Sequence, residues 1–99
     1  MAEDVTVTLV GDFMLERRLE PADITSVREI LAGSDLVVAN LDTVLSDHGA
    51  PMPKWANLRG PRELAHDLKS LGIDVAVLAN NHAMDFGSDG LLDMMAALR

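Results

Sequence analysis

The pattern of apolar and polar residues along this 99-residue chain changes between strand-like and helix-like spacing. Alternating β-branched or mainly apolar runs predict three strands, at residues 5–10, 36–39 and 73–78. The run at 36–39 is continuous, which is typical of a strand buried on both faces. Apolar positions at helical spacing predict three helices, at residues 21–33, 61–72 and 88–98. This order predicts an α/β fold, a βαβαβα segment with a parallel sheet.

Glycine, proline and short polar residues are expected to mark the ends of these elements. Gly11-Asp12 ends the first strand, Pro61 lies in the first turn of the second helix, and Gly33 and Gly72 end two helices. The side chains suited to cap helix starts are Asp23, Thr25, Ser88 and Asp89. Residues 46–59 are predicted to form a long loop. The third helix is expected to bury Leu91, Leu92, Met94, Met95 and Leu98.

Polar residues follow each predicted strand. They are Asp12 after the first strand, Asn40 and Asp42 after the second, and Asn80, Asn81, His82 and Asp85 after the third. Because parallel strands end at the same edge of a sheet, where ligands bind, these three clusters are expected to lie along one edge, here called the strand-end rim. Their side chains offer carboxylates, amide oxygens and an imidazole.

Composition narrows the chemistry that the rim could perform. The net charge is −8, and Lys and Arg form no cluster beyond Arg17-Arg18, which argues against a nucleic-acid partner. There is no cysteine, so any metal must bind through oxygen and nitrogen atoms. Mg, Mn, Fe(II) and Zn accept such ligands, and a site for two ions needs a carboxylate that can bridge them. His82, steered by Asp85, could protonate a leaving group.

Each residue also has a structural explanation when it is taken alone. Asp12 could close a turn through its own backbone, and Asn40 or Asp42 could cap the following segment. A single histidine such as His82 is more often structural than catalytic. His48 and His66 are expected to be ordinary surface residues, and the methionines to be core residues. The functional interpretation therefore depends on the three clusters occurring together.

Three segments, residues 10–15, 39–42 and 78–87, resemble the CapA family of capsule or poly-gamma-glutamate biosynthesis proteins, which are related to the calcineurin-like metallophosphoesterases. The resemblance implies that Asp12 and Asn81 bind metal and that Asp42 bridges two metal ions. It also implies that His82 is catalytic and that Asp85 orients it. The cofactor would be a divalent metal, Mn, Fe, Zn or Mg, in a mononuclear or dinuclear site.

The chain departs from the family pattern in two respects. The family has glutamate where this chain has Asp42, whose shorter side chain reaches less far. The family domain is also longer, with later histidine motifs that complete the metal site. Residues 1–99 are therefore expected to be the N-terminal segment of such a domain, with exposed apolar faces, an incomplete site and weak or no hydrolysis on its own.

The resemblance implies a phosphoesterase linked to capsule or poly-gamma-glutamate biosynthesis, acting on a phosphate ester or a polyglutamate-related substrate. Two alternatives remain open: a non-catalytic component of polymer assembly, and an inactive fragment that self-associates through an unpaired sheet edge. The sequence contains no pattern of a signal peptide or a transmembrane segment, so a cytoplasmic location is expected.

Overall fold

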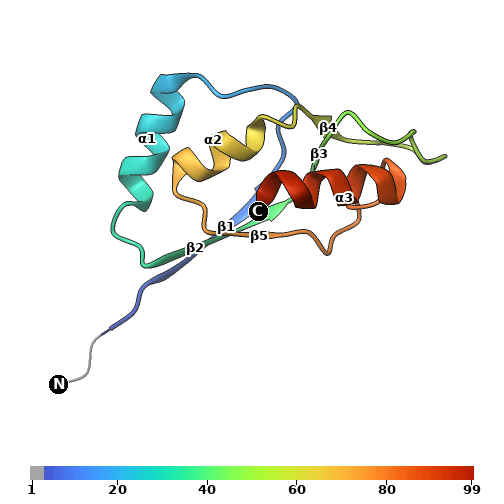
Figure 1. The fold of residues 1–99 in the computed structure, drawn as a ribbon. Helices are drawn as coiled ribbons and strands as arrows, with labels where there is room; N and C mark the ends of the chain where they lie inside the picture. Colours follow the sequence, from blue (N-terminus) through green and yellow to red (C-terminus); the bar gives the residue numbers. More distant parts are fainter. Residues whose placement is uncertain (1–3) are drawn as a thin grey trace.

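Three parallel strands form the centre of the fold (Figure 1). The structure is a computed structural model that describes residues 4–99. Its elements are β1 (Val7–Phe13), α1 (Pro21–Leu31), β2 (Leu36–Leu41), β3 (Val44–Leu45), β4 (Arg59–Gly60), α2 (Leu64–Leu71), β5 (Val75–Val77) and α3 (Gly87–Leu98). The strands lie in the order β1-β2-β5, and both neighbouring pairs are parallel. The predicted α/β fold with a parallel sheet is confirmed.

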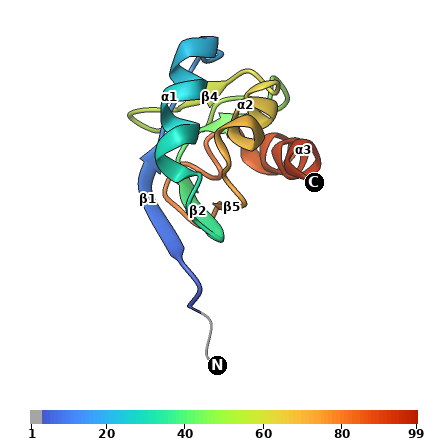
Figure 2. The same ribbon diagram turned by 90° about the vertical axis from the view of Figure 1, so that its left-hand side faces the viewer.

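The helices cover one face of this sheet. Helices α1 and α2 lie on the same side of the three strands (Figures 1 and 2). Alternate residues of β2, such as Val37 and Ala39, are buried, whereas Leu36 is 37% exposed. The prediction that β2 is buried on both faces is therefore wrong. The core consists of side chains from β2, β3, α2 and α3, namely Leu41, Leu45, Leu64, Leu68 and Met94.

Strand β1 does not end at Gly11-Asp12, as the sequence predicts, but continues to Phe13. The pairing with β2 shifts between Val10 and Asp12, which leaves Gly11 as the extra residue of a β-bulge. Beyond the bulge, Asp12 pairs with Asn40 and Phe13 with Leu41. Asp12 is consequently the second-last residue of β1 and lies directly beside β2.

The two helix ends predicted at glycines differ. Gly72 ends α2 in the left-handed conformation, with φ of 94°, and its N–H group donates to the carbonyls of Leu68 and Lys69. Helix α1 ends at Leu31, two residues before Gly33, whose φ is not positive. Helix α2 begins at Leu64 rather than near Pro61, because residues 61–63 form a turn.

The predicted helix caps are wrong, because both helices begin before the expected residues. Helix α1 starts at Pro21, so Asp23 and Thr25 lie inside it, and Thr25 Oγ1 donates to the carbonyl of Pro21. Helix α3 starts at Gly87, so Ser88 and Asp89 also lie inside the helix. Within the described residues, neither helix has a side-chain cap.

Helix α3 buries fewer apolar residues than predicted. Met94 is 1% exposed, and Leu91 and Leu98 pack against the core. Leu92 and Met95 are 61% and 36% exposed, so the prediction that they face inward is wrong. The reason is that positions 91, 94 and 98 already form one stripe of the helix, and each following residue turns about 100° away from it.

Residues 42–63 connect β2 to α2 and contain a feature that the sequence does not predict. Short strands β3 and β4 pair in parallel, with Val44 beside Arg59 and Leu45 beside Gly60. Between them, the predicted loop is irregular and exposed at its tip, where Trp55 is fully exposed. Its residues Lys54 and Leu58 form hydrogen bonds with Asp85, so the loop lies against the turn that follows β5.

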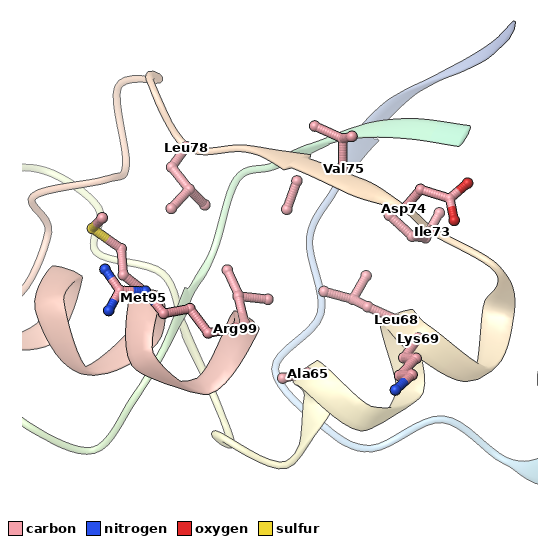
Figure 3. Close-up of a pocket in the computed structure, with 11 residues that line it drawn as sticks. Ala65, Leu68, Lys69, Ile73, Asp74, Val75, Leu78, Met95 and Arg99 are labelled. Carbon is pink, nitrogen blue, oxygen red and sulfur yellow. The ribbon is translucent and has the colours of Figure 1, made fainter. Parts of the chain in front are cut away.

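Exposed apolar residues, which the sequence predicts, occur at the β5 edge of the sheet. Strand β5 lies at the sheet edge, and Val75 and Val77 are 42% and 40% exposed. A mainly apolar hollow of about 610 Å³ lies between α2, β5 and α3, with Leu68, Val75 and Leu78 among its lining residues (Figure 3). In the part of the chain that the structure describes, no helix is long and apolar enough to cross a membrane.

Candidate functional site

Hydrogen bonds between side chains connect the ends of β1, β2 and β5. Asn40 donates from Nδ2 to Oδ1 of Asp12 over 2.8 Å. Asn80 donates from Nδ2 to Oδ1 of Asn40 over 3.0 Å and to the carbonyl of Leu41 over 2.8 Å. The three clusters that are distant in sequence therefore lie side by side, and the predicted strand-end rim is present in the structure.

His82 continues this chain of hydrogen bonds. Its backbone N–H donates to Oδ1 of Asn80 over 3.1 Å, and its Nδ1 lies 2.6 Å from Oδ2 of Asp85. Asp85 is fully buried, and the His82 side chain is 13% exposed. Because an ionised carboxylate only accepts hydrogen bonds, Nδ1 carries the proton and Nε2 is left to accept or donate one. The structure thus brings together the two residues expected to act in catalysis.

Asp85 is held by more than His82. Lys54 Nζ lies 2.6 Å from Oδ1, and the N–H of Leu58 donates to Oδ2 over 2.6 Å. Burial on its own would raise the pKa of Asp85, but the hydrogen bonds from Lys54, Leu58 and His82 outweigh it and hold this pKa below its usual value. Asp85 is therefore an anion at neutral pH.

Lys54 was not singled out by the sequence, which predicts only a loop for its segment. Its Nζ also donates to the carbonyl of Asn81 over 2.9 Å. The contacts span 31 and 27 residues of sequence, so no local pattern of spacing could have indicated them. The one sequence signal is that Lys54 is a rare cation in an acidic chain, since lysine occurs only there and at Lys69.

Asp42 has the burial expected of a residue that binds a cation. It is 7% exposed, and its backbone N–H donates to the carbonyl of Phe13 over 2.9 Å. Among residues 4–99, nothing donates a hydrogen bond to its buried Oδ1. A buried carboxylate oxygen without a partner is destabilising by about 1–3 kcal/mol or more, and a bound cation would satisfy it. The residue therefore fits a divalent metal ligand.

The other predicted metal ligands are more exposed. Asp12 and Asn81 are both exposed, and Asn80, not Asn81, supplies the amide that joins the rim together. Within the described part of the chain, the only group of three carboxylate or histidine side chains with ligand atoms within 4.8 Å of one another is Asp47, His48 and Asp93. Asp12, Asp42 and His82 do not form so close a group.

The Asp47, His48 and Asp93 group lies on the surface between the loop and α3. Asp93 accepts a 2.6 Å hydrogen bond from the hydroxyl of Ser46, which holds the pKa of Asp93 below its usual value, and Arg62 lies 3.3 Å away. His48 and Asp47 are exposed, as the sequence predicts for His48. His66 on α2 is exposed as well.

Comparison with known proteins identifies the family. Residues 6–99 match the model of the family described as bacterial capsule synthesis protein PGA_cap. The capsule biosynthesis protein CapA of Bacillus anthracis is 29% identical over 109 residues, which cover 98% of this chain and 26% of CapA. Two proteins of Sinorhizobium fredii, y4sH and y4uA, both described as uncharacterized, are each 26% identical over 100 residues.

These matches cover most of this chain and a small part of each relative. The alignments with y4sH and y4uA include 92% of this chain and 22% of each relative. The chain thus spans about a quarter of the length of the curated relatives that it matches. The family model extends over all three segments of the predicted resemblance, so that prediction is confirmed. The chain belongs to the bacterial capsule synthesis protein family PGA_cap.

Proposed function

We propose that this chain supplies part of a metal-dependent phosphoesterase site that serves capsule or poly-gamma-glutamate synthesis. The observation that carries the proposal is the position of the His82–Asp85 pair, which is hydrogen-bonded through Asn80 to the strand ends that carry Asp12 and Asp42. A proton-transfer group and carboxylates at one sheet edge are the components that phosphate-ester hydrolysis requires.

Asp12, Asp42 and Asn81 would hold the divalent metal. Carboxylate and amide oxygens suit Mg, Mn, Fe(II) or Zn, and the buried Oδ1 of Asp42 lacks a donor among the described residues. Asn40 holds one oxygen of Asp12 and so restricts rotation of that carboxylate. When bound, the metal would polarise the phosphoryl group and lower the pKa of a water molecule.

His82 would transfer a proton between its Nε2 and the leaving group. The anionic Asp85 fixes the ring through Nδ1 and stabilises the imidazolium form. Space for a substrate is present beside the rim, in a hollow of about 620 Å³ lined by Met14, Leu15, Glu16, Arg17, Thr43 and Leu58. Leu58 also holds Asp85, and Thr43 follows Asp42, so this hollow adjoins the proposed site.

Calorimetric titration of Mn²⁺ into the purified chain tests the proposal. We expect the wild type and Glu29→Ala, an exposed change on α1, to bind Mn²⁺, and Asp12→Ala and Asn81→Ala to bind at least about tenfold more weakly. Equal binding by all four proteins would contradict the metal site. Hydrolysis of p-nitrophenyl phosphate by the full-length protein, compared with its His82→Gln variant, then separates an enzyme from a non-catalytic component of polymer assembly, because residues 1–99 alone are expected to hydrolyse it weakly or not at all.

Self-association is the second candidate property, and one observation favours it. Strand β5 forms a sheet edge with exposed Val75 and Val77, and such an edge can pair with a second copy. Light scattering over a range of concentrations tests this idea. A mass that stays that of one chain at the highest concentration would contradict it.

A further inference from the structure

Lys54 reaches the buried end of the candidate site from an exposed loop. Its ammonium group lies between two acceptors, Oδ1 of Asp85 at 2.6 Å and the carbonyl oxygen of Asn81 at 2.9 Å. The Lys54 side chain is 35% exposed, whereas Asp85 is fully buried. One cation therefore contacts both sides of the turn that carries His82.

The loop around Lys54 wraps Asp85. The N–H of Met52 donates to the backbone carbonyl of Asp85 over 2.8 Å, and the N–H of Leu58 donates to its Oδ2 over 2.6 Å. Asn57 closes the loop by donating from Nδ2 to the carbonyl of Met52 over 3.0 Å. Lys54 lies between Met52 and Leu58 in the sequence. The segment that carries the ammonium group is therefore itself hydrogen-bonded to Asp85 on both sides of Lys54.

The contacts of Lys54 restrict two separate motions. Oδ1 of Asp85 is held by Lys54 while Oδ2 is held by His82 and Leu58, so the carboxylate cannot rotate without breaking hydrogen bonds. The contact with the Asn81 carbonyl fixes the peptide group between Asn81 and His82. The nearby Arg59 cannot replace Lys54, because its guanidinium stacks on Phe86 at 3.6 Å.

We propose that Lys54 is a positioning residue, which fixes the Asn81–His82 peptide and the Asp85 carboxylate together and thereby sets the geometry of both side chains at the rim. The functional meaning of this inference rests on the proposed function, in which Asn81 is a metal ligand and His82 is the proton-transfer group. Outer residues that orient metal ligands affect metal affinity about 10–100-fold when they are changed.

The absence of cysteine from the sequence allows a sharp test. Lys54→Cys can be alkylated with 2-bromoethylamine, which restores an ammonium group on a side chain of nearly the length of lysine. Iodoacetamide gives the matched uncharged product. Lys69→Cys, at the only other lysine and on the exposed side of α2, is treated in the same two ways as the control. Backbone amide NMR signals of Asn81 and His82, Trp55 fluorescence anisotropy and Mn²⁺ affinity are measured.

We expect the aminoethylated protein to match the wild type in all three measurements. The uncharged Lys54→Cys product should show shifted amide signals of Asn81 and His82, lower Trp55 anisotropy and about tenfold weaker Mn²⁺ binding. Both Lys69→Cys products should behave as the wild type. Wild-type amide signals and Mn²⁺ affinity in the uncharged Lys54→Cys product would overturn the proposal.

An unpaired Asp85 could unfold the uncharged product, so a double variant that removes both charges of the ion pair is measured beside it. Lys54→Met/Asp85→Asn is compared with Asp85→Asn, and we expect a further shift of the Asn81 amide signal in the double variant. Identical spectra would overturn the role of Lys54. If the wild type binds no Mn²⁺, the proposed metal site fails, whereas the NMR comparison still decides whether Lys54 positions the turn.

Discussion

Nδ1 of His82 lies 2.6 Å from Oδ2 of Asp85, three residues later in the same turn. The acceptor is a fully buried carboxylate that also binds Lys54. A buried anion between two cationic or potentially cationic groups is stable only while its partners are present. The turn after β5 and the loop that carries Lys54 must therefore fold together, and the geometry of the candidate site depends on both.

Asp85→Asn is expected to lower the free energy of unfolding by about 3 kcal/mol. The amide preserves the shape of the side chain, but it leaves the Lys54 ammonium without its anionic partner and replaces one acceptor by a donor. Urea denaturation at neutral pH measures the change. Asp47→Asn, whose side chain is 91% exposed, is the matched control and should change stability by less than about 0.5 kcal/mol. Equal effects of both changes would contradict the role of Asp85.

The stability of the chain should fall in acid because two buried carboxylates have lowered pKa values. Hydrogen bonds from Arg18 lower the pKa of Asp67, and those from Lys54, Leu58 and His82 lower the pKa of Asp85 against the effect of its burial. Stabilisation by such groups is fully present above the unfolded-state pKa of about 4 and is lost as the pH falls through the folded-state values. Urea midpoints measured from about pH 7 down to pH 2 test this. In Asp67→Asn the urea midpoint should fall less steeply as the pH decreases. An unchanged dependence of the midpoint on pH would contradict the lowered pKa of Asp67.

The three strands of the main sheet and the rim could be predicted from the sequence, because both depend on local patterns of residues. Apolar periodicity locates each strand within a few residues, and the shared polarity of parallel strands then brings Asp12, Asn40 and Asn80 to one edge. The bulge at Gly11 shifted the end of β1 but did not move Asp12 away from Asn40. The prediction of the rim was therefore insensitive to errors in strand boundaries.

Contacts between distant segments could not be predicted in this way. Lys54 meets Asp85, and Arg18 forms hydrogen bonds of 2.9 and 2.7 Å with the buried Asp67, across gaps of 31 and 49 residues. The sequence spacing of neither pair indicates a contact, because the loops that contain Lys54 and Arg18 have no apolar periodicity. The partial exposure of one face of β2 was also missed, because a continuous apolar run such as 36–39 does not reveal whether both faces of a strand are covered.

Asn80→Ala should destabilise the chain by about 2 kcal/mol, whereas Asn81→Ala should change stability by less than about 0.5 kcal/mol. The Asn80 amide makes hydrogen bonds to Asn40, to the carbonyl of Leu41 and to the N–H of His82, and the Asn81 side chain is exposed. Urea denaturation of the two variants measures the difference. The reverse order of stabilities would show that Asn80 does not hold the strand ends together.

Met94→Ala should lower the free energy of unfolding by about 3 kcal/mol. Met94 is 1% exposed in the core, and its sulfur accepts a 3.3 Å hydrogen bond from the N–H of Leu45, so the change creates a cavity and leaves a buried donor without a partner. Met95→Ala, at the next residue with 36% exposure, is the matched control and should cost less than about 1 kcal/mol. Similar losses for the two methionines would contradict the observed orientation of α3.

Gly72→Ala and Gly33→Ala should change stability in opposite directions, although both glycines follow helices. Gly72 has φ of 94°, where an alanine costs about 1 kcal/mol, and a Cβ atom there would meet nothing within 4 Å, so the loss is purely conformational. The φ of Gly33 is not positive, and a Cβ atom there would also meet nothing within 4 Å. Alanine at this position should therefore stabilise the chain by about 0.5 kcal/mol, because it lowers the entropy of the unfolded chain. Thermal unfolding of the two variants separates these effects. A loss of stability in Gly33→Ala equal to that in Gly72→Ala would contradict the backbone conformation observed at Gly33.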